Sequence, residues 1–432
     1  MPEAVVPRVA FVSPTPPART GIASYSARVL AGLQRTGYRD RRTLDVLWPI
    51  RPRHDVDITR YLLGVYHIGN NVEFHGDIYR LAAIRPGVVV LHDLGLDDLV
   101  RGLIAAGDPL GYRAGREALL RSDRMTLAEA KENEPLRTPW CAHVARAARG
   151  VIVHSDFCRR YLEGFGCRTP IHVVPHPVPE RGADVRRAAR TGAQIRARLG
   201  LVGGDVLIVA PGDLNAAKQL GPVVEAVSRL GTNVRLALVG RRIPTWDPEP
   251  TLRSSGLGSR VVLETDVTAG GFLGWLHAAD VIVDLRFPHR GEVSGTLMRA
   301  LQVGRPVVVS GVGTYLDIPD DVVVRVSAGP ADPAELAHAF TRLVDDPERR
   351  ARLGERAREY LHAHAGGDRT ARGYERAIED TISLLLDPRR LALNRWARAL
   401  NDIGISDEGL NEGFGIGYVR GLLDLAPGSR ER

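Results

Sequence analysis

Short apolar segments rich in β-branched residues alternate with helical segments twice along this chain of 432 residues. The first series predicts strands at 8–13, 64–68, 87–91, 150–154 and 171–175, with helices at 21–34, 110–147 and 156–164. The second series predicts strands at 205–210, 235–239, 261–264, 281–285, 306–310 and 322–326, with helices at 217–230, 270–278, 294–303 and 333–344. Such alternation is typical of parallel sheets that are covered by helices on both faces.

A proline-rich break separates the two series. Pro175, Pro177 and Pro179 interrupt the periodicity, and an arginine-rich helical segment follows at 183–199. We therefore predict an α/β protein with two doubly wound, Rossmann-like halves that face a cleft. Further helices are predicted at 347–364, 369–386, 388–403 and 407–424. The predicted domains are 1–180 and 205–385, followed by a helical C-terminal tail at 386–432.

The composition is that of a globular protein, with 44% hydrophobic and 25% charged residues. No apolar run is long enough to cross a bilayer, and residues 1–11 lack the pattern of a signal peptide. We therefore expect a soluble, cytoplasmic protein. Three cysteines without paired spacing support neither a disulfide framework nor a zinc site, so no metal centre is expected.

The net charge is +7, because 58 basic residues oppose 51 acidic ones. No block of basic residues forms a tail, so nucleic acid is not an expected partner. The first half has a modest basic excess. This excess is compatible with a phosphorylated acceptor or with peripheral contact to an anionic membrane, and a solvated arginine-rich face is the alternative explanation.

The segment from Arg286 to Thr296 joins a predicted buried strand to a helix whose first turn is small and polar. The backbone N–H groups of Ser294, Gly295 and Thr296, at the positive end of the helix, are suited to phosphate oxygens. Ser294 as a simple helix cap is the alternative. No Gly-x-Gly-x-x-Gly follows a strand, so a nicotinamide enzyme is disfavoured.

Lys218 is one of only two lysines, since the other 56 basic residues are arginine. It follows the first strand of the second half, in a loop that we expect to point into the cleft. A compact ammonium there favours contact with a phosphate. Solvent exposure is the alternative, because Lys131 lies in an acidic run and needs no such role.

Together these features resemble the retaining GT-B glycosyltransferases of family 4, over the range from Arg8 to Arg390. The motifs that carry the resemblance are Ser13-Pro14, Thr20-Gly21-Ile22-Ala23-Ser24-Tyr25-Ser26, Gly69-Asn70-Asn71 with His75, Leu91-His92-Asp93, Val174-Pro175-His176-Pro177, Gly240, Gly291-Glu292-Val293-Ser294-Gly295 and Gly304-Arg305-Pro306-Val307-Val308. Each motif is weak alone, and their order and spacing make the resemblance specific.

The resemblance implies transfer of a sugar from a nucleotide-diphosphate sugar to an acceptor, with retention at the anomeric carbon and without a metal or cofactor. The first half would bind the acceptor, and the second half would bind the nucleotide sugar. Lys218 would neutralise the leaving diphosphate, Glu292 would accept hydrogen bonds from the sugar, and His92 would face the sugar. His92 could instead be a hydrogen-bonded strand end, with Asp93 capping the next helix.

The other residues that the resemblance implicates fall into two groups. Donor-binding residues would be Gly21, Ile22, Gly212, Arg241, Glu264, Thr265, Arg290, Gly291, Val293, Ser294, Gly295 and Thr296. Acceptor-binding residues would be His67, Asn70, His75 and Asp93. The acceptor itself (a glycan, a lipid-linked sugar, a peptide or a small molecule) is left open, as are the base and the sugar.

Two departures from the family pattern keep other functions open. The second glutamate of the family's Glu-x7-Glu motif is missing: Ala300 lies eight residues after Glu292, and Arg299 stands at that place when counted back from Gly304. The arginine that precedes the family's lysine is also absent, and Arg241 or Arg290 would have to assist. A sugar-nucleotide-binding scaffold that has lost transfer and a GT-B sugar-nucleotide epimerase are the alternatives.

Overall fold

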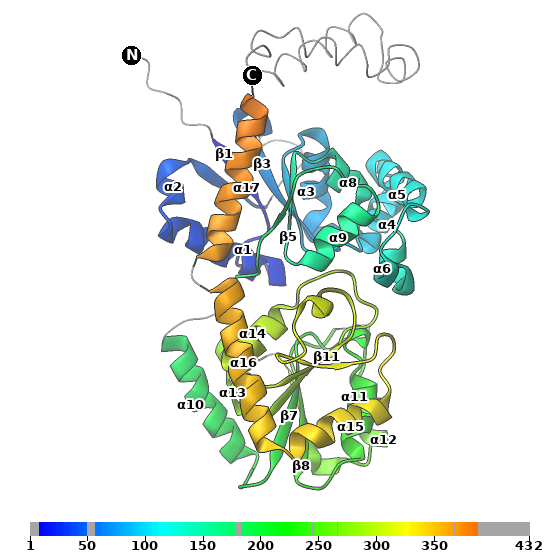
Figure 1. Ribbon diagram of the computed structural model, residues 1–432, viewed down its shortest axis with the longest axis vertical. Helices are drawn as coiled ribbons and strands as arrows, with labels where there is room; N and C mark the ends of the chain where they lie inside the picture. Colours follow the sequence, from blue (N-terminus) through cyan, green and yellow to red (C-terminus); the bar gives the residue numbers. More distant parts are fainter. Residues whose placement is uncertain are drawn as a thin grey trace, which may run out of the picture. The chain divides into compact units, whose positions relative to one another are not determined.

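The computed structural model describes residues 8–49, 57–177, 183–243, 246–265, 267–366 and 368–387. Two six-stranded parallel sheets organise this part of the chain (Figure 1). The first has the strand order β2-β1-β3-β4-β5-β6, and the second has the order β12-β11-β10-β7-β8-β9. The predicted fold class, two doubly wound halves, is therefore confirmed.

The first sheet uses residues before the proline-rich break. Its strands are β1 (Val9–Val12), β2 (Leu44–Leu47), β3 (Leu63–Ile68), β4 (Val88–Leu91), β5 (Gly150–Val153) and β6 (Ile171–Val173). Its helices are α1 (Gly21–Arg35), α2 (Tyr38–Arg41), α3 (Val72–Ile84), α4 (Asp97–Ala105), α5 (Pro109–Ser122), α6 (Ala128–Glu132), α7 (Glu134–Arg137), α8 (Ala142–Ala147) and α9 (Asp156–Gly164), with a 3-10 turn η1 (Ile58–Arg60).

The second sheet begins after α10 (Ala183–Arg198). Its strands are β7 (Val206–Pro211), β8 (Val234–Val239), β9 (Val261–Glu264), β10 (Val281–Asp284), β11 (Val307–Ser310) and β12 (Val324–Val326). Its helices are α11 (Leu220–Ser228), α12 (Glu249–Ser254), α13 (Ala269–Ala278), α14 (Gly295–Val303), α15 (Pro333–Val344) and α16 (Pro347–Ala365), with 3-10 turns η2 (Ala216–Lys218), η3 (Gly258–Arg260) and η4 (Gly313–Asp317).

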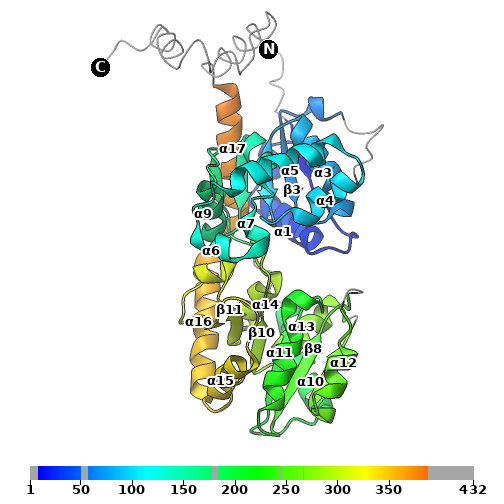
Figure 2. The same cartoon turned by 90° about the vertical axis from the view of Figure 1, so that its right-hand side faces the viewer.

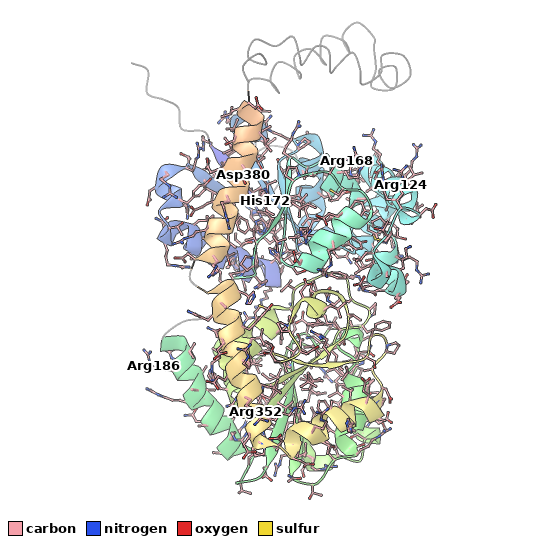
Figure 3. The ribbon with its side chains drawn as sticks, viewed as in Figure 1. Arg124, Arg168, His172, Arg186, Arg352 and Asp380 are labelled. Carbon is pink, nitrogen blue, oxygen red and sulfur yellow. The ribbon has the colours of Figure 1, made fainter. Side chains whose placement is uncertain are left out.

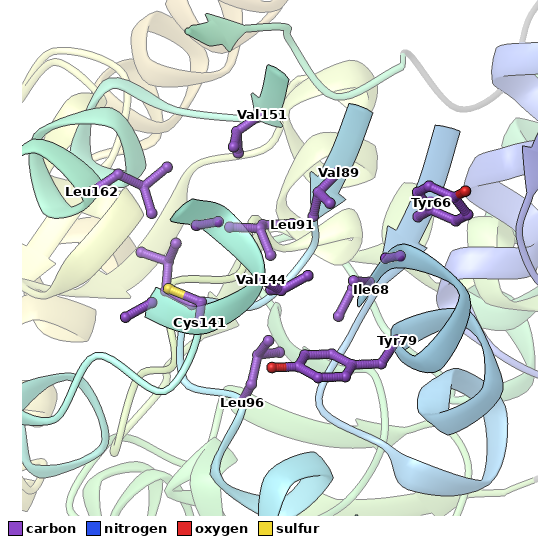
Figure 4. Packing of buried hydrophobic residues seen from close by; sticks show 14 of the residues in the cluster. Tyr66, Ile68, Tyr79, Val89, Leu91, Leu96, Cys141, Val144, Val151 and Leu162 are labelled. Atoms are coloured by element: carbon purple, nitrogen blue, oxygen red, sulfur yellow. The ribbon is translucent and has the colours of Figure 1, made fainter. Parts of the chain in front are cut away.

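Each sheet buries both faces, which explains the continuous apolar runs of its central strands. Figure 4 shows one face of the first sheet, where Ile68, Val89 and Leu91 pack against Tyr79 of α3 and Val144 of α8. In the second half, α13 and α14 cover one face while α11 and α15 cover the other. Helix α10 packs closely on α13 (Figure 2).

Three features of the first half differ from the sequence prediction. Strand β2 and helices α3 and α4 were not predicted, and the helical stretch expected at 110–147 is divided into four short helices, α5 to α8. Pro109 and Pro135 each stand in the first turn of a new helix, where a proline fits because its missing N–H has no acceptor there. Pro135 therefore accounts for the separate start of α7 within this stretch.

The last helix of the described chain returns to the first sheet. Helix α17 (Arg369–Leu386) places Tyr374 within hydrogen-bonding distance of Tyr25 in α1, with 2.9 Å between the two hydroxyls. Thr370 donates a hydrogen bond to the carbonyl of Pro175 at 2.9 Å. The predicted tail helices after residue 387 lie outside the described residues, and the predicted domain boundaries remain predictions.

The surface of both halves is rich in arginine. Arg124, Arg168, Arg186 and Arg352 are exposed and extend outward in Figure 3. This distribution is the one that a general preference for arginine over lysine would produce. Among the helices that the structure describes, none is long and apolar enough to cross a membrane.

Candidate active site

The strand order of the second sheet reverses at β7, and we call the region at the carboxyl ends of β7 and β10 the crevice. The chain proceeds from β7 to β8 on one side, whereas β10 lies on the other side of β7. At such a reversal of strand order the loops after the two strands diverge and leave room for a ligand at their carboxyl ends. These loops carry Lys218 and the segment Arg286 to Thr296, so the structure brings the two predicted parts of the donor site together.

Lys218 is buried, with 5% of its surface exposed, and its ammonium forms an ion pair with Asp284 at the end of β10. The other carboxylate oxygen of Asp284 accepts a hydrogen bond from the Tyr315 hydroxyl at 3.0 Å. Burial lowers the pKa of Lys218, and Asp284 opposes this shift. The structure thus contradicts the alternative of a solvent-exposed lysine, and the predicted contact of Lys218 with a phosphate stays a prediction.

The ammonium of Lys218 nevertheless lies beside the first turn of α14. A Cβ atom built on Gly212 would lie 3.2 Å from Nζ of Lys218 and 3.3 Å from Oγ1 of Thr296. Gly212 has φ +114°, a conformation that favours glycine. The lysine, the loop glycine and the helix terminus therefore converge on one small region.

Ser294 caps α14, as the alternative explanation of its sequence position proposed. Its hydroxyl accepts a hydrogen bond from the N–H of Leu297 at 3.2 Å, and its side chain is buried. The cap satisfies one N–H of the first turn, and the N–H groups of Gly295 and Thr296 have no intrahelical acceptor. Capping and anion binding are therefore compatible at this helix.

Glu292 is held in place by two donors from its own loop. Its carboxylate accepts hydrogen bonds from Nη1 of Arg286 and from the backbone N–H of Arg290, both at 2.8 Å. Burial alone would raise the pKa of Glu292, but the charge of Arg286 and the hydrogen bond from the backbone N–H of Arg290 hold this pKa below its usual value. Glu292 is therefore ionised at neutral pH, and its carboxylate is hydrogen-bonded to Arg286 and Arg290.

The ring of His289 forms hydrogen bonds that fix the conformation of this loop. Its side chain is fully buried, and its Nδ1 accepts a hydrogen bond from the N–H of Gly291 at 2.8 Å. Its Nε2 lies 3.3 Å from Oγ1 of Thr314, and that hydroxyl donates to the carbonyl of Glu292 at 2.8 Å. This arrangement requires a neutral imidazole with its proton on Nε2.

The loop also contacts the first half. The carbonyl of Arg290 accepts hydrogen bonds from the N–H groups of Leu94 and Gly95 at 2.8 and 2.9 Å, and its guanidinium pairs with Asp97 at 3.0 Å. Asn133 donates to the carbonyl of His289 at 2.5 Å. Arg290 thus holds its loop against the first half.

Asp93 lies next to this contact and interacts electrostatically with Glu292. Burial, followed by the charge of Glu292, raises the pKa of Asp93 to about 7. Its Oδ2 accepts a hydrogen bond from the N–H of Asn70 at 2.8 Å. Asp93 is therefore close to its midpoint of titration at neutral pH.

This raised pKa predicts a pH-dependent effect of Asp93→Asn. The folded state holds the Asp93 proton more tightly than the unfolded state, so wild-type stability falls as the pH rises from about 4 to about 7. The variant lacks this loss and keeps an oxygen for the Asn70 hydrogen bond. Urea unfolding should show a stability gain that is about 1–3 kcal/mol larger at pH 8 than at pH 5. An equal gain at both pH values would contradict the assignment.

Tyr25 of α1 lies at the centre of a group of histidines in the first half. Its ring centroid is 4.7 Å from that of His92 and 5.0 Å from those of His154 and His176. Nδ1 of His67 lies 3.1 Å from Nε2 of His92. Burial lowers the pKa of His154 to about 4 and that of His176 to about 3, so these rings are neutral at physiological pH.

His92 directly follows β4 and contacts this group of histidines. Burial is the main cause that lowers the pKa of His92. His67 is fully buried and His75 is 2% exposed, with its Nδ1 3.0 Å from the carbonyl of His67. His67 and His75 are therefore almost inaccessible to solvent. Their predicted acceptor role remains a prediction.

Three of the remaining predicted residues form hydrogen bonds or ion pairs within the protein. Asn70 caps α4 by accepting from the N–H of Leu99 at 3.0 Å. Arg241 pairs with Asp213 at 2.7 Å, and Glu264 pairs with Arg198 at 2.6 Å. The other positions lie in loops or first turns beside these contacts: Gly21 and Ile22 begin α1, Thr265 follows β9, and Gly291 and Val293 flank Glu292.

Sequence reasoning missed three residues of this region as contributors: Asp284, Arg286 and His289. Arg286 lies within the segment that the sequence singled out, two residues beyond β10. Its position at a strand end was a usable signal, because side chains that follow the strands of such a sheet line the crevice. The pairing of Asp284 with Lys218 joins residues 66 apart and had no local signal.

A pocket of about 410 Å³ lies on another side of α14. It is lined by residues that include His154, His176, Ser294, Thr314 and Tyr360. Ser294 and Val293 are the predicted donor-site residues that reach it, whereas Lys218 and Glu292 do not line it. The pocket is therefore adjacent to the crevice and not identical with it.

Comparison with known proteins places this geometry in context. Residues 205–346 match the family model described as Glycosyl transferases group 1. A D-inositol 3-phosphate glycosyltransferase from Xylanimonas cellulosilytica is 32% identical over 199 residues, which are 44% of this chain and 46% of that protein. The chain spans about half the length of the curated relatives that it matches.

Solved structures share the fold. A sucrose-phosphate synthase from Thermosynechococcus elongatus is 18% identical with a TM-score of 0.62, over 88% of this chain and 100% of that chain. The Anabaena protein HepE, in complex with UDP and glucose, is 14% identical with a TM-score of 0.58, over 86% of this chain and 99% of that chain.

These matches and the two parallel sheets lead to one conclusion. The chain has the GT-B fold, and its residues 205–346 are similar to the glycosyl transferases group 1 family.

Proposed function

We propose that this protein is a retaining glycosyltransferase that uses a nucleotide-diphosphate sugar. The observation that carries the proposal is the convergence of Lys218, Gly212 and the first turn of α14 at the strand-order reversal. That convergence lies inside the segment that matches the Glycosyl transferases group 1 model. A diphosphate is the ligand that best suits a buried ammonium beside a helix N-terminus.

In the proposed reaction, the acceptor oxygen forms a bond to the anomeric carbon and the bond from this carbon to the phosphate oxygen breaks. The departing phosphate takes the acceptor proton, which conserves charge without a protein base. Lys218 and the N–H groups of Gly295 and Thr296 would stabilise the negative charge that develops on the diphosphate. Retention is proposed from the resemblance to family 4, and an NMR assignment of the product's anomeric configuration tests it.

We also propose that transfer requires neither a metal nor a cofactor, because Lys218 and the helix terminus supply positive charge at the leaving group. Undiminished turnover in EDTA is the expected result. Complete loss that added magnesium restores would overturn this part of the proposal.

The first experiment is an assay of the purified full chain with a panel of UDP-, GDP-, ADP- and dTDP-sugars. Release of the nucleoside diphosphate, by slow hydrolysis or by transfer, is expected with at least one donor. The relative from Xylanimonas is a D-inositol 3-phosphate glycosyltransferase, so inositol 3-phosphate is the first acceptor to include. Binding of a donor without any release would favour the alternative below.

A sugar-nucleotide-binding scaffold is the second candidate. Lys218 and Arg286 are each ion-paired with a carboxylate, to Asp284 and Glu292 respectively, and the second family glutamate is missing. A site whose cations are already neutralised could bind a donor without activating it. The same donor panel separates the two functions, because only an enzyme releases the diphosphate.

We also propose that the protein is cytoplasmic and that its first half, which would bind the acceptor, contacts the surface of an anionic membrane. Helix α5 exposes Tyr112, Leu119 and Leu120, with side chains of Arg113 and Arg116 on the same helix also exposed. Apolar side chains among arginines suit a surface of anionic headgroups. Flotation with phosphatidylglycerol vesicles, compared with phosphatidylcholine vesicles, tests this contact.

A further inference from the structure

Arg286 occupies the loop after β10, next to the loop that carries Lys218. The two loops are joined by backbone: the N–H of Phe287 donates to the carbonyl of Ala217 at 2.9 Å. Gln219 adds a second link by donating to the carbonyl of Phe287 at 3.1 Å. The charge of Arg286 is near enough to lower the pKa of Lys218, after the larger effect of burial. The two cations therefore stand on adjacent loops of the crevice.

The guanidinium of Arg286 interacts with Glu292 and with the Tyr315 hydroxyl, but its Nε is left over. Nη1 of Arg286 donates a hydrogen bond to Glu292 at 2.8 Å. The backbone N–H of Arg286 donates to Oγ of Ser310 at 3.0 Å, and this bond fixes the position of the Arg286 backbone. Nε is buried and has no hydrogen-bond partner among the residues that the structure describes. A buried donor without an acceptor is costly, and a ligand oxygen would remove that cost.

The remaining nearby arginines are engaged elsewhere. Arg290 pairs with Asp97 and docks its loop on the first half, and Arg241 pairs with Asp213. Neither has a buried nitrogen that lacks a partner in the described chain. The sequence also has no arginine directly ahead of Lys218. Among these arginines, Arg286 is therefore the one whose buried Nε lacks a hydrogen-bond acceptor in the described chain.

We propose that Arg286 is a second cation for the leaving diphosphate, with Glu292 as the residue that positions it. This inference rests on the proposed function, since it assigns a role within the same donor site. Glu292 would hold the guanidinium by one edge, and the buried Nε edge would bind a phosphate oxygen together with Lys218. Planar guanidinium donors suit phosphate oxygens in this way.

The test is calorimetric binding of UDP, GDP, ADP and dTDP, and of the matching nucleosides, to the full chain. Arg286→Gln should weaken binding of the preferred nucleoside diphosphate by about tenfold to a hundredfold and leave nucleoside binding unchanged. Arg286→Lys should recover part of the loss. Glu292→Gln should not weaken diphosphate binding, because it removes a competing anion and leaves the cation in place.

Arg305→Gln is the matched control. Arg305 belongs to the same domain, is partly buried and also has an Nε without a partner in the described chain, but it lies at the turn between α14 and β11. Its variant should bind diphosphate like the wild type. The double variant Arg286→Gln with Glu292→Gln removes both charges of the ion pair, and it should also lose diphosphate binding.

The outcomes separate this inference from the proposed function. If the wild type binds a nucleoside diphosphate and Arg286→Gln binds it equally well, the role of Arg286 is wrong and the proposed function stands. Equal losses for Arg286→Gln and Glu292→Gln would reduce the pair to a structural ion pair and would also overturn the inference. If the wild type binds no nucleoside diphosphate, both proposals fall.

Discussion

Replacing Lys218 with methionine is expected to reduce release of the nucleoside diphosphate by about 10²–10³-fold, because the leaving group loses its closest cation. The same change should reduce the free energy of unfolding by about 3–5 kcal/mol. The reason is that Asp284, which is fully buried, would keep the Tyr315 hydroxyl but lose its ion pair. Donor turnover and urea unfolding measure the two effects separately.

A double variant separates catalysis from folding. Lys218→Met combined with Asp284→Asn removes both buried charges, so most of the lost stability should return while turnover stays low. Lys131→Met is the control, because Lys131 is the chain's other lysine and is exposed on α6. Wild-type turnover in the double variant would exclude Lys218 from the reaction.

Gly240→Ala should produce the second large effect. A Cβ atom at Gly240 would lie 1.9 Å from the carbonyl oxygen of Gly212, and Gly240 has φ +150°. The backbone of Gly212, which lies beside Lys218 and Thr296, would have to move. We expect a loss of roughly 2–5 kcal/mol in the free energy of unfolding, from overpacking and backbone strain. Binding of the nucleoside diphosphate should weaken by about tenfold or more, because the anion site is displaced.

The matched control is Gly221→Ala in the first turn of α11. A Cβ atom there meets nothing within 4 Å, and Gly221 does not have a positive φ. Its stability should rise by about 0.5–1 kcal/mol, as expected for glycine replaced by alanine in a helix. If Gly240→Ala unfolds and binds like this control, the contact between Gly240 and Gly212 is not a constraint on the site.

Much of the second half could be predicted from the sequence. The prediction of helices at 333–344 and 369–386 agrees with α15 and α17, and the strand at 261–264 agrees with β9. These segments have clear periodicity and capping, such as Asp332 before Pro333, and their structure depends mainly on residues nearby in sequence. Strand β2 is a short edge strand in which Val46 is exposed, so its apolar pattern was too weak to predict a strand.

The candidate site divides in the same way. Local sequence indicated the loop from Arg286 to Thr296, the cap at Ser294 and the unusual lysine, because a strand end, a helix start and a rare residue are all visible along the chain. Only the tertiary structure decided that Lys218 pairs with Asp284, that Arg286 pairs with Glu292 inside the crevice, and that Asp93 lies close enough to Glu292 to have a raised pKa. The physical reason is that burial and charge are set by which strand ends become neighbours, and the order of strands in a sheet is not encoded by the periodicity of any one strand.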